Sequence, residues 1–196
     1  MRDDPQIQFD PMRMLWDGMA RKATNLKDAG RETAHSAKLR AVGRRLTLGE
    51  LRMVQAMFGT TTGFGEARVV ARNMWWPYPN DRAITPNGNI FFPHQAYRDD
   101  YSVATVPLPL RALFMHEATH IYQFCVLKIV VFAVGPFDRN YTYELVEGQA
   151  LKDYGLEQMG QIVQDFYTIS NGGKVAGKRY RPADYAAAVP IRSATK

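Results

Sequence analysis

Apolar and polar residues alternate at helical spacing in "LTLGELRMVQAMFG", which spans residues 46–59. Three apolar positions lie on one helical face, and they are Leu51, Val54 and Met57. Thr47 followed by Glu50 is the pattern of a capping box, in which the two residues satisfy each other's backbone N–H groups. Gly59 follows as a natural stop. The pattern therefore predicts a short capped helix.

Two longer segments carry stronger helical patterns. The first, "LPLRALFMHEATHIYQFCVL" at 108–127, has Pro109 in its first turn and no later glycine or proline to interrupt it. The second, "GLEQMGQIVQDFYTISNGG" at 155–173, ends on a pair of glycines. Its apolar stripe consists of Leu156, Met159, Val163, Phe166 and Tyr167. Both segments are predicted to be helices.

Short strands are expected between the first two helices. "ARVVARNMWW" at 67–76 has strand character and ends at "PYPN", and residues 89–92, "NIFF", form a second short run that stops at a proline. Helix, short strands, helix, loop and helix in this order predict an α+β fold that is rich in helix.

The chain is expected to contain three parts. Residues 1–45 form an N-terminal helical extension, since 11–45 read as one or two amphipathic helices with a short apolar stripe. Residues 46–173 form the main domain. Residues 174–196 form a basic C-terminal tail with six basic residues and one acid, expected to be solvated.

Composition restricts the chemistry. The hydrophobic content of 46% is typical of a globular protein. Cys125 is the only cysteine, so an intramolecular disulfide framework and a multi-cysteine zinc site are excluded. Any metal site must therefore use histidines and carboxylates. The net charge of +6 is concentrated in the tail, but no nucleic-acid motif accompanies it, so nucleic-acid binding is not expected.

Targeting signals are not apparent. The N-terminus "MRDDPQIQFD" lacks an apolar stretch, so we expect synthesis in the cytoplasm without a classical signal peptide. The most apolar run, at 125–135, contains Lys128 and is far shorter than the ~20 residues of a membrane span. We expect this run to lie in the core.

The segment "MHEATHIYQ" at 115–123 carries the candidate chemistry. His116 and His120 are one helical turn apart, so both can place a ring nitrogen on the same ion. Glu117 is turned away from that ion but lies beside a water bound to it, where it can act as general base. The flanking apolar residues are those of a buried helix: Leu113, Phe114, Ala118, Ile121 and Phe124. The HExxH spacing therefore predicts a metal site, most simply for Zn2+.

The third ligand is left open by the pattern alone. Glu157 begins the helix "LEQMGQIVQDF", and Gly160 one turn later would let two helices approach closely. Glu147, in "VEGQALKDYG", is the main competitor, and Glu144 is a weaker one.

Other polar residues could lie near this site and support it. Gln123 lies on the histidine face and could orient a ligand. His94 is expected to be structural or solvated. An oxyanion donor could be one of several tyrosines, and the candidates are Tyr143, Tyr154 and Tyr167.

Four blocks of the sequence resemble a known family. "LTLGELRMVQAMFG", "TPNGNIFFPHQAYRDDYS", "LFMHEATHIYQ" and "DYGLEQMGQIVQDFY" occur in the order found in the Rhs-element Vgr-related proteins associated with bacterial type VI secretion. More distantly, "HEATHIYQ" is similar to the core of zincin-like (gluzincin-type) metallopeptidase domains in cargo of contractile injection systems. The resemblance spans roughly residues 46–170.

The resemblance implies a minimal zincin-like fold, with a small sheet packed on the HExxH helix and a second helix that supplies a glutamate. It also implies that "NIFF" at 89–92 is an edge strand able to pair with an extended peptide. His116 and His120 would be ligands and Glu117 the base. Glu157 matches the glutamate block of the Vgr-related proteins, although "EGQA" around Glu147 resembles the third-ligand stretch of many zincins. We favour Glu157.

The expected function is a zinc-dependent metallopeptidase that hydrolyses peptide bonds as a type VI secretion effector or accessory protein. Its partners would be a protein or peptide substrate and a Vgr-type secretion component or an immunity protein, and it would leave the cytoplasm through the type VI system. The alternative is a non-catalytic zincin-fold module that binds a secretion component.

Overall fold

The structure is a computed structural model that describes residues 43–71, 82–86, 88–129, 140–186 and 188–189. Its elements are β1 (Arg44–Arg45), α3 (Leu48–Phe58), β2 (Arg68–Ala71), β3 (Ile90–Phe92), α4 (Leu108–Cys125), η1 (Leu151–Asp153), α6 (Leu156–Ser170) and η2 (Pro182–Tyr185). A three-stranded sheet combined with helices confirms the predicted α+β class. The helices predicted for residues 11–42 lie outside the described residues.

The sheet has the strand order β1-β2-β3. β1 pairs antiparallel with β2, and β2 pairs parallel with β3. Arg44–Arg45 therefore belong to the sheet, which corrects their prediction as part of a helical extension. β3 is at an edge of the sheet, as expected, but its Phe91 forms an antiparallel bridge with Ile84. Part of this edge is thus already paired within the chain.

Helix α3 begins and ends as its sequence predicts. The Glu50 backbone N–H donates to Thr47 Oγ1 over 3.1 Å, and the Thr47 N–H donates to Glu50 Oε2 over 2.9 Å. Gly59 ends the helix in the left-handed conformation, at φ 69°. This φ favours glycine because a Cβ would be strained there.

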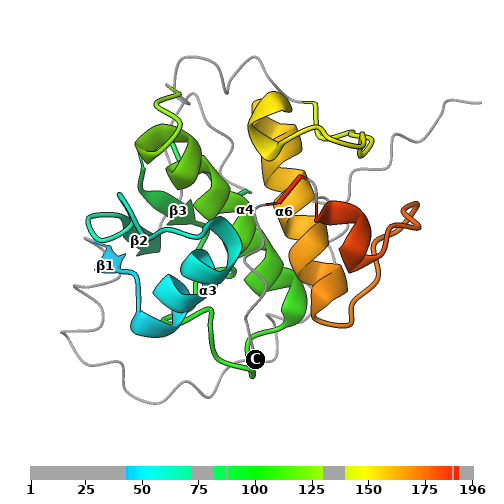
Figure 1. The fold of residues 1–196 in the computed structure, drawn as a ribbon. Helices are drawn as coiled ribbons and strands as arrows, with labels where there is room; N and C mark the ends of the chain where they lie inside the picture. The colour runs from blue at the N-terminus through cyan, green and yellow to red at the C-terminus, as the bar shows by residue number, and fades with distance from the viewer. Residues whose placement is uncertain (1–42, 72–81, 87, 130–139, 187, 190–196) are drawn as a thin grey trace, which may run out of the picture.

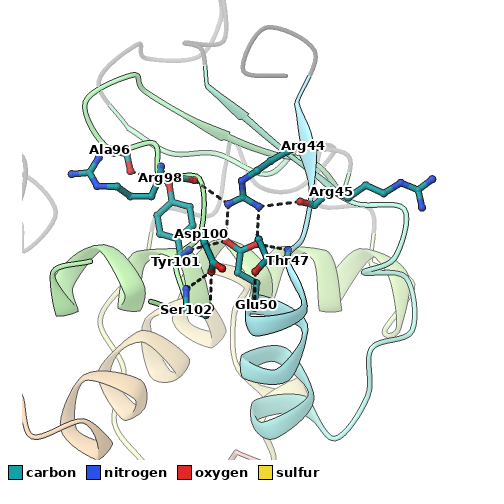
Figure 2. Close-up of polar contacts among 9 residues, drawn as sticks. All are labelled: Arg44, Arg45, Thr47, Glu50, Ala96, Arg98, Asp100, Tyr101 and Ser102. Atoms are coloured by element: carbon teal, nitrogen blue, oxygen red, sulfur yellow. Dashed lines mark hydrogen bonds and ion pairs between the residues drawn. The ribbon is translucent and has the colours of Figure 1, made fainter. Parts of the chain in front are cut away.

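Glu50 also joins α3 to the sheet, which the capping pattern did not reveal. Its carboxylate is fully buried and accepts two hydrogen bonds from the Arg44 guanidinium, at 2.7 and 2.6 Å. It accepts a further bond from the Tyr101 backbone N–H at 2.9 Å. Figure 2 shows how Arg44 reaches from β1 over the start of α3 to complete this network. A buried charge with this many partners fixes β1, α3 and the loop at Tyr101 relative to one another.

Helices α4 and α6 pack side by side, and both contribute many residues to the core. Figure 1 shows α4 with the sheet and α3 on one side and α6 on the other. As predicted, Leu113, Phe114 and Ile121 are fully buried. Phe124 is the exception, with 38% of its surface exposed. The α4 helix is therefore a central helix, covered along almost its whole length.

Residues beyond 173 contribute to the folded unit. Tyr185 in η2 is fully buried, and its ring lies 5.7 Å from that of Phe166 in α6. The Leu151 backbone N–H donates to the carbonyl of Ala188 over 2.9 Å. The segment from 174 is therefore not solvated throughout, because its described portion packs against α6 and η1. The boundary placed at residue 173 itself stays a prediction.

The apolar run at 125–135 is described only up to Ile129. Cys125, Leu127 and Ile129 are half-buried and pack against the core, whereas Lys128 is exposed. Residues 130–135 of the run lie outside the described residues. Within the part of the chain that the structure describes, no helix is long and apolar enough to cross a membrane.

Candidate metal centre

The three residues of the HExxH pattern are buried on α4. His116, Glu117 and His120 expose 2%, 3% and 5% of their surfaces. Polar side chains are seldom buried to this degree unless they have partners or bind an ion. The groups that surround these three side chains therefore indicate whether they bind an ion.

Glu157 meets both histidines from the first turn of α6. Its Oε2 lies 3.1 Å from His116 Nε2 and 3.6 Å from His120 Nε2. The three possible ligand atoms all lie within 4.8 Å of one another. Two imidazole nitrogens and one carboxylate oxygen are the donor set of catalytic zinc sites that keep a fourth position open. The residues present fit a zinc ion.

Gly160 allows the two helices to meet at this point. A Cβ built on Gly160 would lie 2.7 Å from both Cε1 and Nε2 of His116, which is closer than real Cβ contacts allow. The imidazole therefore rests on bare backbone of α6, one turn after Glu157. A glycine is therefore required at position 160, because a larger residue would collide with the imidazole of His116.

Gln123 fixes the orientation of His120. The Gln123 amide nitrogen donates to the Leu156 carbonyl over 2.8 Å, so its Oε1 must be the atom that faces His120 Nδ1, at 2.8 Å. An amide oxygen only accepts, so the proton of His120 resides on Nδ1. With Nδ1 protonated, Nε2 is the ring atom that faces Glu157, and its lone pair can bind a metal ion once the proton on Nε2 is displaced.

Glu117 is held by a residue from outside α4. The Thr85 hydroxyl donates to Glu117 Oε2 over 2.7 Å, and both side chains are buried. Burial raises the pKa of Glu117, while His120, His116 and the Thr85 hydrogen bond oppose the rise. Thr85 precedes the proline of "TPNG", and no motif in the sequence marks it as a partner of Glu117.

The charges of the cluster favour a cation among the three ligand candidates. Burial alone would lower the pKa of His120, but the Glu157 carboxylate outweighs it and raises this pKa to about 9. Burial would likewise raise the pKa of Glu157, and the two histidines instead hold it well below its ordinary value. In the ion-free protein the positive charge is a proton, and metal binding would displace it.

Tyr141 lies beside the cluster and was not among the tyrosines considered from the sequence. Its ring is 6.1 Å from that of His116, and it is hydrogen-bonded to Glu157. Burial and the nearby carboxylates raise its pKa, so the phenol stays protonated and can donate. It lies in the loop that leads to η1, and no periodicity in that loop predicts that Tyr141 would lie near α4.

The other candidates lie elsewhere in the described structure. Glu144 and Glu147 are exposed and are not part of the His116 cluster. His94 is exposed, as expected. The three tyrosines named from the sequence have other partners: Tyr143 bonds Asp165, Tyr154 bonds the Val146 backbone and Tyr167 interacts with Arg111.

No family model matches the chain. The chain is 30% identical over 138 residues to the type VI secretion system spike protein VgrG2b of Pseudomonas aeruginosa. That alignment covers 66% of this chain but only 13% of the spike protein. The similarity links the chain to Vgr-related proteins of type VI secretion, as expected.

A solved structure has a similar fold. The effector domain of Pseudomonas aeruginosa VgrG2b superposes with a TM-score of 0.61 and is 24% identical, and the match covers 90% of this chain and 93% of that domain. At this identity the likeness concerns the fold. It extends over nearly the whole of both chains, so the α+β arrangement is shared with that domain.

Proposed function

We propose that this protein is a zinc-dependent peptidase that acts as an effector of type VI secretion. The observation that carries the proposal is the meeting of His116 Nε2, His120 Nε2 and Glu157 Oε2 within 4.8 Å, beside the buried Glu117. The similarity to a type VI spike protein and to its effector domain supports the secretion context. Delivery through the type VI system would take the protein out of the cytoplasm in which it is made.

Each residue of the centre has a separate task in this proposal. His116, His120 and Glu157 would hold the zinc ion, which when bound supplies a Lewis acid and lowers the pKa of a water molecule toward ~7. Glu117 directly follows the ligand candidate His116 and is buried with it, so its carboxylate would accept the proton of the attacking water. It then passes the proton to the amine that leaves the cleaved peptide bond.

Two neighbours prepare these groups for the reaction. The Thr85 hydroxyl holds one oxygen of Glu117 and leaves the other for the water proton. Tyr141 offers a protonated phenol next to Glu157, where it can donate to the oxygen of the scissile carbonyl as negative charge develops. A protein or peptide is the substrate class that suits this combination of base, Lewis acid and oxyanion donor.

The decisive experiment measures zinc and peptide cleavage together. Protein purified without chelator should contain about one zinc ion per chain, as expected for a three-ligand site. It should also cleave members of a proteome-derived peptide mixture, read by mass spectrometry. Glu117→Gln should keep the zinc and lose cleavage, because the amide cannot take a proton, whereas the exposed Glu144→Gln should behave as the wild type.

Two results would count against the proposal. Near-zero zinc in the wild-type protein would remove the metal site. Zinc without cleavage, together with unchanged secretion phenotypes in Glu117→Gln, would favour the alternative of a non-catalytic binding module that contacts a Vgr-type component or an immunity protein.

A further inference from the structure

A polar stripe runs along the face of α6 that is packed against α4. Glu157, Gln161 and Asp165 are spaced by four residues, so they follow one another on the same helical face. Gln161 and Asp165 expose only 6% and 3% of their surfaces. The metal-site proposal uses the first member of this stripe and leaves the two buried members without a task.

Two buried atoms, one on α4 and one in this stripe, have no hydrogen-bond partner among the described residues. They are Nδ1 of His116 and Oε1 of Gln161. An unsatisfied buried polar atom costs roughly 1–3 kcal/mol, so two of them in one region call for an explanation. Nδ1 of His116 can carry a proton and donate, whereas Oε1 of Gln161 can only accept, so the two atoms are complementary.

The backbone places the His116 ring against the residue that precedes Gln161. The His116 ring rests on Gly160, and Gln161 is the next residue of α6. His116 is also one of the charges that act on the pKa of Asp165, one turn beyond Gln161. Both observations place the His116 ring near the second half of the stripe.

Asp165 determines which end of the Gln161 amide is left without a partner. The Gln161 amide nitrogen donates to Asp165 Oδ1 over 2.6 Å, so Oε1 is the end left free. The other carboxylate oxygen of Asp165 accepts the hydroxyl of Tyr143 at 2.7 Å, and that hydroxyl lies 2.9 Å from the hydroxyl of Tyr185. Asp165 is therefore anchored by Tyr143, a residue outside α6 that is itself bonded to Tyr185, and cannot easily turn away.

We propose that Gln161, oriented by Asp165, is a positioning residue for His116 and accepts its Nδ1–H hydrogen bond through one buried bridging water. The bond would hold the imidazole in the tautomer whose Nε2 lone pair points to the ion, and it would make that nitrogen a better ligand. This inference rests on the proposed zinc site. It gives His116 the same kind of support that Gln123 gives His120, so each histidine is oriented by a glutamine amide.

The first test measures zinc affinity in matched glutamine variants. Gln161→Met removes the amide while keeping the length of the side chain, and Gln164→Met makes the same change three residues later on α6. Competition with a chromophoric zinc chelator should show affinity reduced about 10- to 100-fold for Gln161→Met. Gln164→Met should match the wild type. Thermal unfolding of both variants checks that each is folded.

The second test reads the His116 ring itself. Two-bond 1H–15N spectra of the zinc-loaded wild-type protein should show the His116 proton on Nδ1, with the slow exchange of a hydrogen-bonded imidazole. In Gln161→Met this proton should exchange faster, which a purely structural role of Gln161 would not cause.

The outcomes separate this inference from the proposed function. A wild-type protein that binds no zinc would overturn both. Zinc binding in the wild type, with unchanged affinity in a folded Gln161→Met or with rapid exchange of the His116 Nδ1 proton, would overturn the role of Gln161 alone.

Discussion

The imidazole of His116 rests on the backbone of Gly160, so closely that a Cβ at position 160 would lie 2.7 Å from the Nε2 atom of the ring. Nε2 is also the atom that faces Glu157. The close approach of α4 and α6 and the geometry of the candidate metal site are therefore one and the same packing contact.

Gly160→Ala is expected to weaken zinc binding on the order of tenfold or more, because the new methyl group displaces the His116 ring from its partners. The same change favours the helix itself by about 1 kcal/mol, so lost affinity would not reflect a weaker α6. Chelator competition measures the affinity. Gly65→Ala is the control, since a Cβ there has nothing within 4 Å. Equal zinc affinity in the two variants would contradict the contact.

The third ligand is tested by a pair of carboxylate variants. Glu157→Gln should lower the bound zinc from about one ion per chain to a small fraction, because an amide oxygen is a poor ligand compared with a carboxylate. Glu147→Gln should retain the zinc, since Glu147 is exposed and not part of the cluster. Elemental analysis of both proteins decides between them, and the reverse pattern would show that the chain folds differently around the ion.

The helices were predictable from the sequence because their signals are local. The Thr47–Glu50 capping box and the apolar stripe of 155–173 depend only on residues within a few turns. The two-residue strand at Arg44–Arg45 was not predictable, since so short a strand has no period of its own and exists only through pairing with β2.

The site was predictable in part for the same reason. His116, Glu117 and His120 share one helix, so their spacing determines their common position. Glu157 comes from another helix, and the residues alone did not separate it from Glu147 without the resemblance. Some contacts between distant segments carried no signal at all, and the hydrogen bond from Thr85 to Glu117 is an example.

Tyr141 is expected to act on the reaction and not on the metal. Tyr141→Phe should lower kcat about 100- to 1,000-fold, the usual loss for one oxyanion donor, while zinc content stays that of the wild type. Tyr167→Phe serves as control, because Tyr167 is half-buried on α6 but interacts with Arg111. Steady-state kinetics on a peptide found in the cleavage screen give the comparison. Loss of zinc in Tyr141→Phe would instead assign the phenol to ligand positioning.

The segment beyond residue 173 is expected to stabilise the fold. Tyr185 is fully buried against Phe166 and bonded to Tyr143. Tyr185→Ala should reduce the free energy of unfolding by about 3–5 kcal/mol, as for other large aromatic residues removed from a core. Urea unfolding provides the measurement, with the exposed Lys174→Ala as control. A Tyr185→Ala protein as stable as the control would show that the segment is dispensable.

The Arg44–Glu50 pair is expected to contribute more to the free energy of unfolding than an ion pair on the surface. The Glu50 carboxylate is fully buried and receives both nitrogens of the Arg44 fork, at 2.7 and 2.6 Å. In Glu50→Gln one carboxylate oxygen becomes an NH2 group that faces the guanidinium, so a buried charge loses its partner. The loss of stability should be about 3–5 kcal/mol.

The chain contains a matched control for this change. Arg45 and Glu66 also form an ion pair, at 3.3 Å, but their side chains are 59% and 85% exposed. Glu66→Gln should leave the urea midpoint unchanged, because solvent screens such a pair and its partners remain hydrated without it. The two substitutions are chemically identical, and the arginine partners of the two glutamates are neighbours on β1. A difference in urea midpoint between the two variants therefore measures the effect of burying the charge. Equal midpoints would mean that the Arg44 guanidinium becomes hydrated when Glu50 is neutralised.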